Sequence, residues 1–273
     1  MINFKLKTGI AIAAIITVSI FMACGKKNST TTPSPSPTPT PTPGATTVYP
    51  TRVILEDHTG TWCGHCPRLG AKLDAALTTY PKLIGITIHN GDAMATSFDG
   101  PIRGINGVTG FPTGVINRAA NWNETEGAIL PYLNATSNIG VAIESTVAGA
   151  VVSGKVKILN GKAYTNNYKI HILLVEDNLI YNQTNYGYNG QPNPIVNKVH
   201  NDVLRLYSTN VQGDDIPVAN KTFGNVYEQN FTFNTAGFNL ANCKIIAYVT
   251  ANGAKEILNA NEVKAGLSAV ATL

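Results

Sequence analysis

The stretch Trp62-Cys63-Gly64-His65-Cys66-Pro67 decides the fold, and it follows the apolar run Val53-Ile54-Leu55 closely. A short apolar run predicts a buried strand, and a proline is tolerated in the first turn of a helix. The motif therefore lies where a strand passes into a helix. Two thiols at this spacing form a dithiol/disulfide pair, which predicts thiol–disulfide exchange as the chemistry.

The residues around the motif alternate between strand and helix patterns. This alternation predicts an α/β domain over residues 48–136, after which the pattern changes. The predicted strands are 51–57, 83–89 and 114–116, and the predicted helices are 66–79, part of 92–106, and 123–134.

Specific residues make this segment resemble the thioredoxin fold. Asp57 lies six residues before Cys63, where thioredoxins carry a buried acid, and Trp62 precedes the first cysteine. The tripeptide Phe111-Pro112-Thr113 resembles the cis-proline loop that faces the dithiol. The resemblance implies that Trp62, Phe111, Pro112 and Thr113 shape a substrate groove. One departure is the stretch 117–123, which leaves little room for the usual fourth strand.

The second half, residues 137–273, consists of short runs with period-2 alternation bounded by Gly and Asn. This pattern predicts an immunoglobulin- or fibronectin-like β-sandwich. His171 alternates with isoleucines, so we expect it to face solvent, and Cys243 in an apolar run is expected to be a buried small hydrophobe. A long loop over residues 177–197, rich in Tyr and Asn, interrupts the strands.

The motif predicts a role for each polar neighbour. Cys63 is the expected nucleophile because unpaired N–H groups at a helix N-terminus stabilise its thiolate, and Cys66 is the expected resolving thiol. His65 would add positive charge or a hydrogen bond beside Cys63. Asp57 is either a proton acceptor for Cys66 or an ordinary strand-end acid, and Trp62 is either a packing lid or a substrate contact.

Two other interpretations of the motif lead away from catalysis. A disulfide without turnover would be structural only. A metal site is not expected, because a structural zinc site needs four ligands and a second pair is missing. We therefore predict no metal and no cofactor beyond the redox-active disulfide Cys63–Cys66.

The N-terminus predicts export and anchoring. Residues 1–23 carry two lysines and a short apolar run, the layout of a secretory signal, and Cys24 follows at a lipobox-like position. The alternative is an ordinary signal peptide with an incidental cysteine. Residues 24–47 alternate Thr or Ser with Pro, which favours a semi-rigid tether of roughly 3 Å per residue. We expect membrane attachment through a lipid on Cys24.

Charge argues against nucleic acid as a partner. The net charge of +4 equals the contribution of Lys5, Lys7, Lys26 and Lys27, so the rest of the chain is neutral. A neutral body without a basic run lacks the electrostatic footprint of a nucleic-acid binder.

Across both halves the chain resembles the bacterial outer-membrane-protein-twenty-eight-related lipoproteins. The resemblance rests on residues 55–67 (LEDHTGTWCGHCP), on 200–205 (HNDVLR) and on Gly213-Asp214. It implies a thioredoxin-like domain followed by a β-domain. Together with the signal, it implies a lipid-anchored protein in the periplasm or outer membrane, within the cell envelope of a Gram-negative bacterium.

Two functions fit these patterns. The first is a membrane-tethered envelope thiol–disulfide oxidoreductase that acts on protein thiols and disulfides. The second is an envelope interaction lipoprotein, in which the thioredoxin-like domain is a scaffold and the β-sandwich, with its Tyr-rich loop, recognises a partner.

Overall fold

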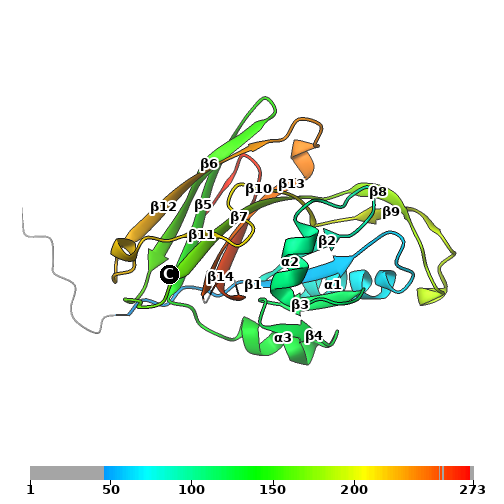
Figure 1. Ribbon diagram of the computed structural model, residues 1–273, viewed down its shortest axis with the longest axis horizontal. Coiled ribbons are helices and arrows are strands. Elements are labelled where there is room, and N and C mark those ends of the chain that lie inside the picture. The colour runs from blue at the N-terminus through cyan, green and yellow to red at the C-terminus, as the bar shows by residue number, and fades with distance from the viewer. Residues whose placement is uncertain (1–45, 252, 254, 271–273) are drawn as a thin grey trace, which may run out of the picture. The chain divides into compact units, whose positions relative to one another are not determined.

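The computed structural model describes residues 46–251, 253 and 255–270 and is mostly β (Figure 1). The predicted α/β domain followed by a separate β-sandwich is wrong, because strands from both halves of the chain join one nine-stranded sheet. In sheet order these are β14 (Lys255–Lys264), β13 (Cys243–Ala251), β7 (Tyr168–Glu176), β10 (Val203–Tyr207), β2 (Leu83–His89), β1 (Val53–Thr59), β3 (Thr113–Ile116) and β4 (Ala120–Trp122), while β11 (Asp214–Asp215) pairs with β7.

The two halves meet between β10 and β2. Val203 of β10 pairs with Thr87 of β2 in parallel register, and the Thr87 N–H donates to the Asp202 carbonyl at 2.8 Å. On its other side β10 pairs antiparallel with β7. The sheet therefore contains strands from both sides of residue 136.

Strand β7 explains the error, because it is buried on both faces. Ile172 and Leu174 pack into the core shared with the second sheet, whereas Leu173 and Val175 pack with the isoleucines of β2. In a sandwich strand with one face exposed to solvent, apolar residues would occupy only every second position. His171 is likewise buried and not solvent-facing, and its ring stacks on Tyr248 at 4.4 Å.

The helices cover the β1–β2 end of the sheet. The predicted helix over residues 66–79 is confirmed as α1 (Cys66–Thr79), which packs with α3 (Glu126–Leu133) against β1. On the opposite face, Ile102 of α2 (Asp99–Asn106) packs against β2. The stretch 117–123, expected to be too short for a strand, nevertheless forms the three-residue β4 by turning back onto β3.

The remaining strands form two smaller sheets. A four-stranded sheet packs on β7 and β13 through a common core, which also buries the free Cys243, as predicted. A separate hairpin, β8 with β9, lies at the α1 end of the molecule (Figure 1). The four-stranded sheet consists, in order, of β12 (Val226–Asn234), β6 (Val151–Asn160), β5 (Ile139–Ala148) and β15 (Ser268–Ala269). The hairpin consists of β8 (Leu179–Gln183) and β9 (Ile195–His200). Single 3₁₀ turns span Tyr188–Gly190, Val218–Asn220 and Leu240–Asn242.

Candidate disulfide site

Cys63 and Cys66 form a disulfide where β1 passes into α1. Backbone hydrogen bonds close the loop: the Cys63 N–H donates to the Gly60 carbonyl at 3.0 Å, and the Cys66 N–H donates to the Cys63 carbonyl at 3.2 Å. Cys66 is the first residue of α1, and Pro67 lies in its first turn. Because both cysteines are buried, access to the disulfide depends on the residues around this loop (residues 60–66, the dithiol loop).

Aromatic side chains form one wall beside the dithiol loop. The Trp62 indole is exposed, donates from Nε1 to the Asn90 carbonyl at 2.7 Å, and meets the Phe111 ring edge-on at 5.5 Å. The Phe111–Pro112 peptide bond is cis, and the Thr113 hydroxyl donates to the Gly110 carbonyl at the start of β3. These side chains come from two segments 50 residues apart and converge at the loop.

The hairpin β8–β9 forms the opposite wall. Its connecting loop runs along the dithiol loop, where the Thr184 N–H donates to the Thr61 carbonyl at 2.8 Å and the Tyr186 N–H donates to the Gly64 carbonyl at 2.9 Å. The Gln183 amide donates to the carbonyls of Gly60 and Cys63 at 3.2 and 3.0 Å. Four hydrogen bonds therefore fasten the second half of the chain to the backbone of the dithiol loop.

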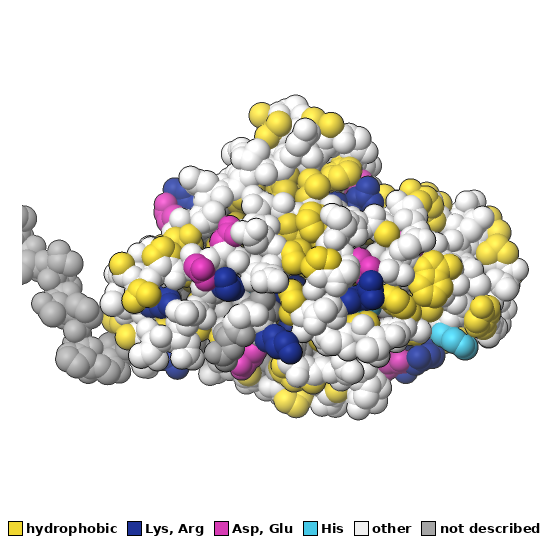
Figure 2. All heavy atoms as spheres, in the orientation of Figure 1, with side chains coloured by type: hydrophobic (Ala, Val, Ile, Leu, Met, Phe, Trp, Pro, Cys, Tyr) yellow, Lys and Arg dark blue, Asp and Glu magenta, His cyan; other side chains and the backbone are white. Residues whose placement is uncertain are grey.

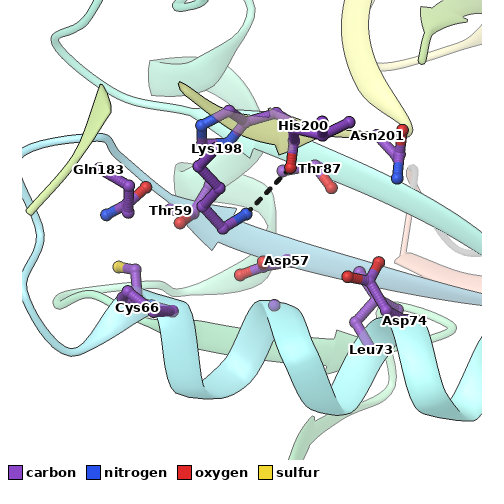
Figure 3. Close-up of a pocket in the computed structure, with 13 residues that line it drawn as sticks. Asp57, Thr59, Cys66, Leu73, Asp74, Thr87, Gln183, Lys198, His200 and Asn201 are labelled. Carbon is purple, nitrogen blue, oxygen red and sulfur yellow. Dashed lines mark hydrogen bonds between the residues drawn. The ribbon is translucent and has the colours of Figure 1, made fainter. Parts of the chain in front are cut away.

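Behind Cys66 lies a small polar cavity between β1, α1 and β9 (Figure 3). Its volume is about 30 Å³. The Lys198 side chain extends from β9 toward Asp57, and its amine donates to the Val199 carbonyl at 3.3 Å (Figure 3). The cavity is lined by Asp57, Cys66, Asp74, Gln183, Lys198 and His200, among others.

Burial controls the charges around this cavity. It raises the pKa of Asp57 to about 7, an effect that Lys198 opposes and that Asp74 and Glu124 reinforce. Burial also lowers the pKa of Lys198, while the two nearby aspartates act in the opposite direction. A carboxyl that titrates near neutrality beside Cys66 is able to give or take a proton when the disulfide opens.

Two buried histidines continue the polar surface away from the disulfide. The rings of His200 and His89 meet edge-on at 5.2 Å. His89 Nδ1 lies 2.7 Å from Asp92 Oδ2, and this same oxygen accepts from the Thr61 N–H of the dithiol loop at 2.7 Å. Burial lowers the pKa of His200 to about 3, so its ring is neutral at physiological pH.

Within the described residues, no group of three or more His, Cys, Asp and Glu side chains is arranged to hold a metal ion. None of the described helices has the length and apolarity needed to cross a membrane. The predicted lipid-attachment residue, Cys24, lies outside the described residues, as do the signal and most of the tether.

Sequence comparison settles the family. The profile of the family described as "Outer membrane protein Omp28" matches residues 103–269, which is more than half of the chain. The chain belongs to the Omp28 family. The predicted family is thereby confirmed, and so is the predicted location in the cell envelope of a Gram-negative bacterium. No curated protein sequence matches this Omp28-family chain.

Solved structures are similar to this chain at low identity, and one of them shares its fold. HBP35 of Porphyromonas gingivalis is similar with a TM-score of 0.65 and 17% identity, over 82% of this chain and 79% of that one. Protein AGR_C_4864 of Agrobacterium tumefaciens gives 0.45 and 13%, over 78% and 94%. A domain of the outer membrane lipoprotein Omp28 from Porphyromonas gingivalis gives 0.33 and 16%, over 48% and 90%. Only the first match has a TM-score above 0.5, so it alone informs the fold, and at 17% identity it does not inform the activity.

The structure brings together most of the residues singled out from the sequence. Asp57 and Cys66 share the cavity, and Trp62 and Phe111 touch. His65 is exposed at the start of α1, with its ring edge-on to Tyr186 at 5.2 Å. Sequence reasoning missed the contributions of the hairpin, namely Gln183, Lys198 and His200, because more than 100 residues separate them from the motif and no spacing signals the contact.

Proposed function

We propose that this Omp28-family protein is an envelope interaction protein. It recognises a protein partner at the surface formed by the β8–β9 hairpin and the dithiol loop. The observation that carries the proposal is the set of exposed apolar side chains on one short hairpin. Ile180, Tyr186 and Val196 are 59%, 66% and 62% exposed, and Trp62 on the adjacent loop is also exposed.

Two further features support partner recognition at this surface. Apolar side chains gather at the hairpin end of the molecule (Figure 2). Exposed apolar patches are typical of interaction sites, and tyrosine supplies rigid contact area at low entropic cost. The hairpin also lies within the segment that the Omp28 profile matches, whereas the Cys63–Cys66 pair lies outside it. We expect the partner to present an extended segment that pairs with a free edge of the hairpin.

Site-specific photo-crosslinking in the cell envelope tests this function. A photoreactive residue at position 180 or 196 should give a discrete adduct with one or a few envelope proteins. The same residue at Val218, which is exposed and lies on the 3₁₀ turn Val218–Asn220 outside the hairpin, is the matched control. Adduct patterns that do not differ between the hairpin and Val218 would reject the proposal.

A second candidate function is thiol–disulfide exchange with such a partner. The specific observation that favours it is the cavity that brings the Asp57 carboxyl to the inner side of Cys66. In the oxidising direction, a partner thiolate attacks Cys63 Sγ, the Cys63–Cys66 bond breaks, and Cys66 leaves as a thiolate that takes up a proton. A second partner thiolate then attacks the mixed disulfide and releases Cys63. Two electrons pass from the partner dithiol to the protein.

Trapping of mixed disulfides tests the second candidate. Cys66→Ser removes the resolving thiol, so it should accumulate covalent complexes with envelope proteins that reductant dissolves. Cys63→Ser is the control, because Cys66 is buried on the cavity side and should capture little. If Cys66→Ser captures nothing, and the wild type neither reduces insulin nor reoxidises reduced RNase in a Cys63-dependent manner, the disulfide is structural only.

A further inference from the structure

Strand β12 (Val226–Asn234) ends the four-stranded sheet, and among the described residues no strand lies beyond it (Figure 1). All of its residues pair with β6 in one continuous antiparallel register. Two hydrogen bonds just beyond its ends fix which residues bond to β6. The Asn160 N–H donates to the Asn225 carbonyl at 3.1 Å, and the Thr235 N–H donates to the Ala150 carbonyl at 2.8 Å. Hydrogen-bonded pairs alternate along an antiparallel ladder, so the odd-numbered residues of β12 bond to β6 and the even-numbered ones point their N–H and C=O groups outward.

The outward-pointing groups form an open row along the whole strand. They belong to Val226, Glu228, Asn230, Thr232 and Asn234, which are all exposed. None of the described residues hydrogen-bonds to the backbone of these five on the outer side. A row of unpaired N–H and C=O groups is a template for another strand.

Within the described residues, the other sheet edges carry features that discourage such pairing. The edge strands β4 and β15 have only three and two residues. In β14 the pairing with β13 shifts register twice, and Glu256 has a φ of +56°. The hairpin β8–β9 also contains a register shift. Strand β12 has no register shift and no Pro, Gly, Lys or Arg, so its long edge lacks the usual protection.

We propose that β12 pairs with β12 of a second copy of this chain, antiparallel across a two-fold axis at Asn230. The two four-stranded sheets then form one continuous sheet. In this register Val226 lies opposite Asn234 of the other copy, Glu228 lies opposite Thr232, and Asn230 lies opposite itself. The surface belongs to a different sheet from the β8–β9 hairpin, and the inference does not depend on the function proposed above.

The charges along β12 fit this antiparallel pairing. Glu228 is the one charged residue of the strand, and the register places it opposite an uncharged threonine. Parallel in-register pairing would instead place two Glu228 side chains opposite each other, which is destabilising. Within its own copy Glu228 lies 2.8 Å from Lys155 and 3.9 Å from Lys157, and Lys157 also pairs with Glu144. These two lysines and two glutamates cancel, so the approaching edges do not repel.

Asn230 favours a second copy over an unrelated strand. Its side-chain amide contains both a donor and an acceptor, so two Asn230 amides that face each other across the axis are able to hydrogen-bond reciprocally. A two-fold contact uses the same surface patch on both copies, and it therefore requires this kind of self-complementarity. Strand pairing covers little apolar area, so we expect a reversible dimer and not a permanent one.

Amide hydrogen exchange in the wild type tests the pairing without any substitution. It is followed residue by residue by NMR on the full chain at low and high protein concentration. The amides of Glu228, Asn230 and Thr232 should exchange fast at low concentration and become protected at high concentration. Those of Gln229 and Phe231 bond to β6 and should be protected at both. Outward amides whose exchange does not change with concentration would overturn the proposal.

Sedimentation of the full chain measures the dimer itself. The wild type should show a monomer–dimer equilibrium over the micromolar range, and a monomer throughout would overturn the proposal. Asn230→Pro removes an N–H that points outward and leaves the hydrogen bonds to β6 in place, a position where an edge strand tolerates proline. The variant should stay monomeric while the Gln229 and Phe231 amides remain protected. A dimer that persists in this variant forms through another surface and would overturn the assignment to β12.

The register is tested by charge at position 232. Thr232→Glu places two glutamate pairs opposite each other across the axis and should weaken the dimer by about three- to tenfold at low salt. Thr232→Lys creates two opposite-charge pairs and should strengthen it by a similar factor. The matched control is Thr146, an exposed residue of β5 that β6 separates from β12. Glu or Lys there should leave the dimer unchanged. Equal effects of Glu and Lys at position 232 would overturn the antiparallel register.

Discussion

Tyr186 lies directly over Gly64, the residue that follows Cys63 in the dithiol loop. A Cβ placed on Gly64 would approach Tyr186 Cγ to 2.4 Å, and the Tyr186 N–H donates to the Gly64 carbonyl. Glycine is therefore required at position 64 by the close approach of the hairpin. The sequence between the two cysteines is matched to a tyrosine 122 residues further along the chain.

We expect Gly64→Ala to loosen the hairpin. The added methyl displaces the Tyr186 ring, so residues 183–194 should exchange their amide hydrogens faster and become more sensitive to proteolysis. Gly100→Ala is the matched control, since nothing lies within 4 Å of a Cβ at that position. Equal protection of the hairpin in the two variants would show that Tyr186 does not hold it in place.

The Asp57 carboxyl should make stability depend on pH in a defined direction. Burial raises its pKa from 3.8 to about 7, so the folded protein binds this proton more tightly than the unfolded chain does. The corresponding stabilisation is present below pH 4 and is lost as the pH rises through 7. Asp57→Asn is neutral at every pH, and it should be more stable than the wild type at pH 8 by roughly 2–4 kcal/mol, but not at pH 4.

Urea unfolding at the two pH values measures this difference. Asp215→Asn serves as the control, because Lys169 lowers the pKa of that exposed carboxyl and the variant should gain no stability at pH 8. A gain for Asp57→Asn of the same size at pH 4 and pH 8 would mean that the effect is packing and not ionisation.

The local elements around the motif could be predicted from the sequence, but the sheet that contains them could not. The apolar stripe of residues 66–79 and the buried run 83–89 specify α1 and β2 through short-range periodicity. The pairing of Val203 with Thr87 depends on contacts between residues more than 100 positions apart, which periodicity does not encode. One local pattern does indicate the larger sheet. The run Ile172-Leu173-Leu174-Val175 is apolar at every position, which indicates a strand buried on both faces.

The residues of the candidate site likewise include some that the sequence predicts and some that it does not. Cys63, Cys66 and Asp57 are linked by fixed short spacing along one strand and its following helix, so sequence reasoning finds them. Lys198 and His200 alternate on β9 with exposed neighbours, a pattern shared by any surface hairpin, and only the fold shows that they line the same cavity as Cys66. The composition of the Tyr-rich loop, residues 177–197, does not signal its contact with Gly64.

Removal of Arg118 should cost much of the folding free energy. Its guanidinium lies 3.0 Å from Glu56, and both side chains are fully buried. Arg118→Met leaves the Glu56 carboxylate uncompensated, which typically costs about 3–5 kcal/mol. Combining it with Glu56→Gln should recover part of that loss in urea unfolding, because the buried negative charge is then gone. A double variant no more stable than Arg118→Met would assign the loss to packing.

His58 should make the protein sensitive to acid. Burial lowers its pKa to about 4, so the folded state binds a proton less tightly than the unfolded chain, whose histidine titrates near 6.5. The stabilisation is therefore present above pH 6.5 and is lost as the pH falls through 4, by roughly 3 kcal/mol in total.

His58→Gln keeps an acceptor for the Asn106 amide, which lies 3.0 Å from Nε2, and cannot be protonated. Its free energy of unfolding should fall less steeply than that of the wild type between pH 6.5 and 4, while the two curves run parallel above pH 7. Parallel curves over the whole range would show that His58 does not contribute to acid unfolding, leaving His171 and His200, whose pKa values burial also lowers, as its source.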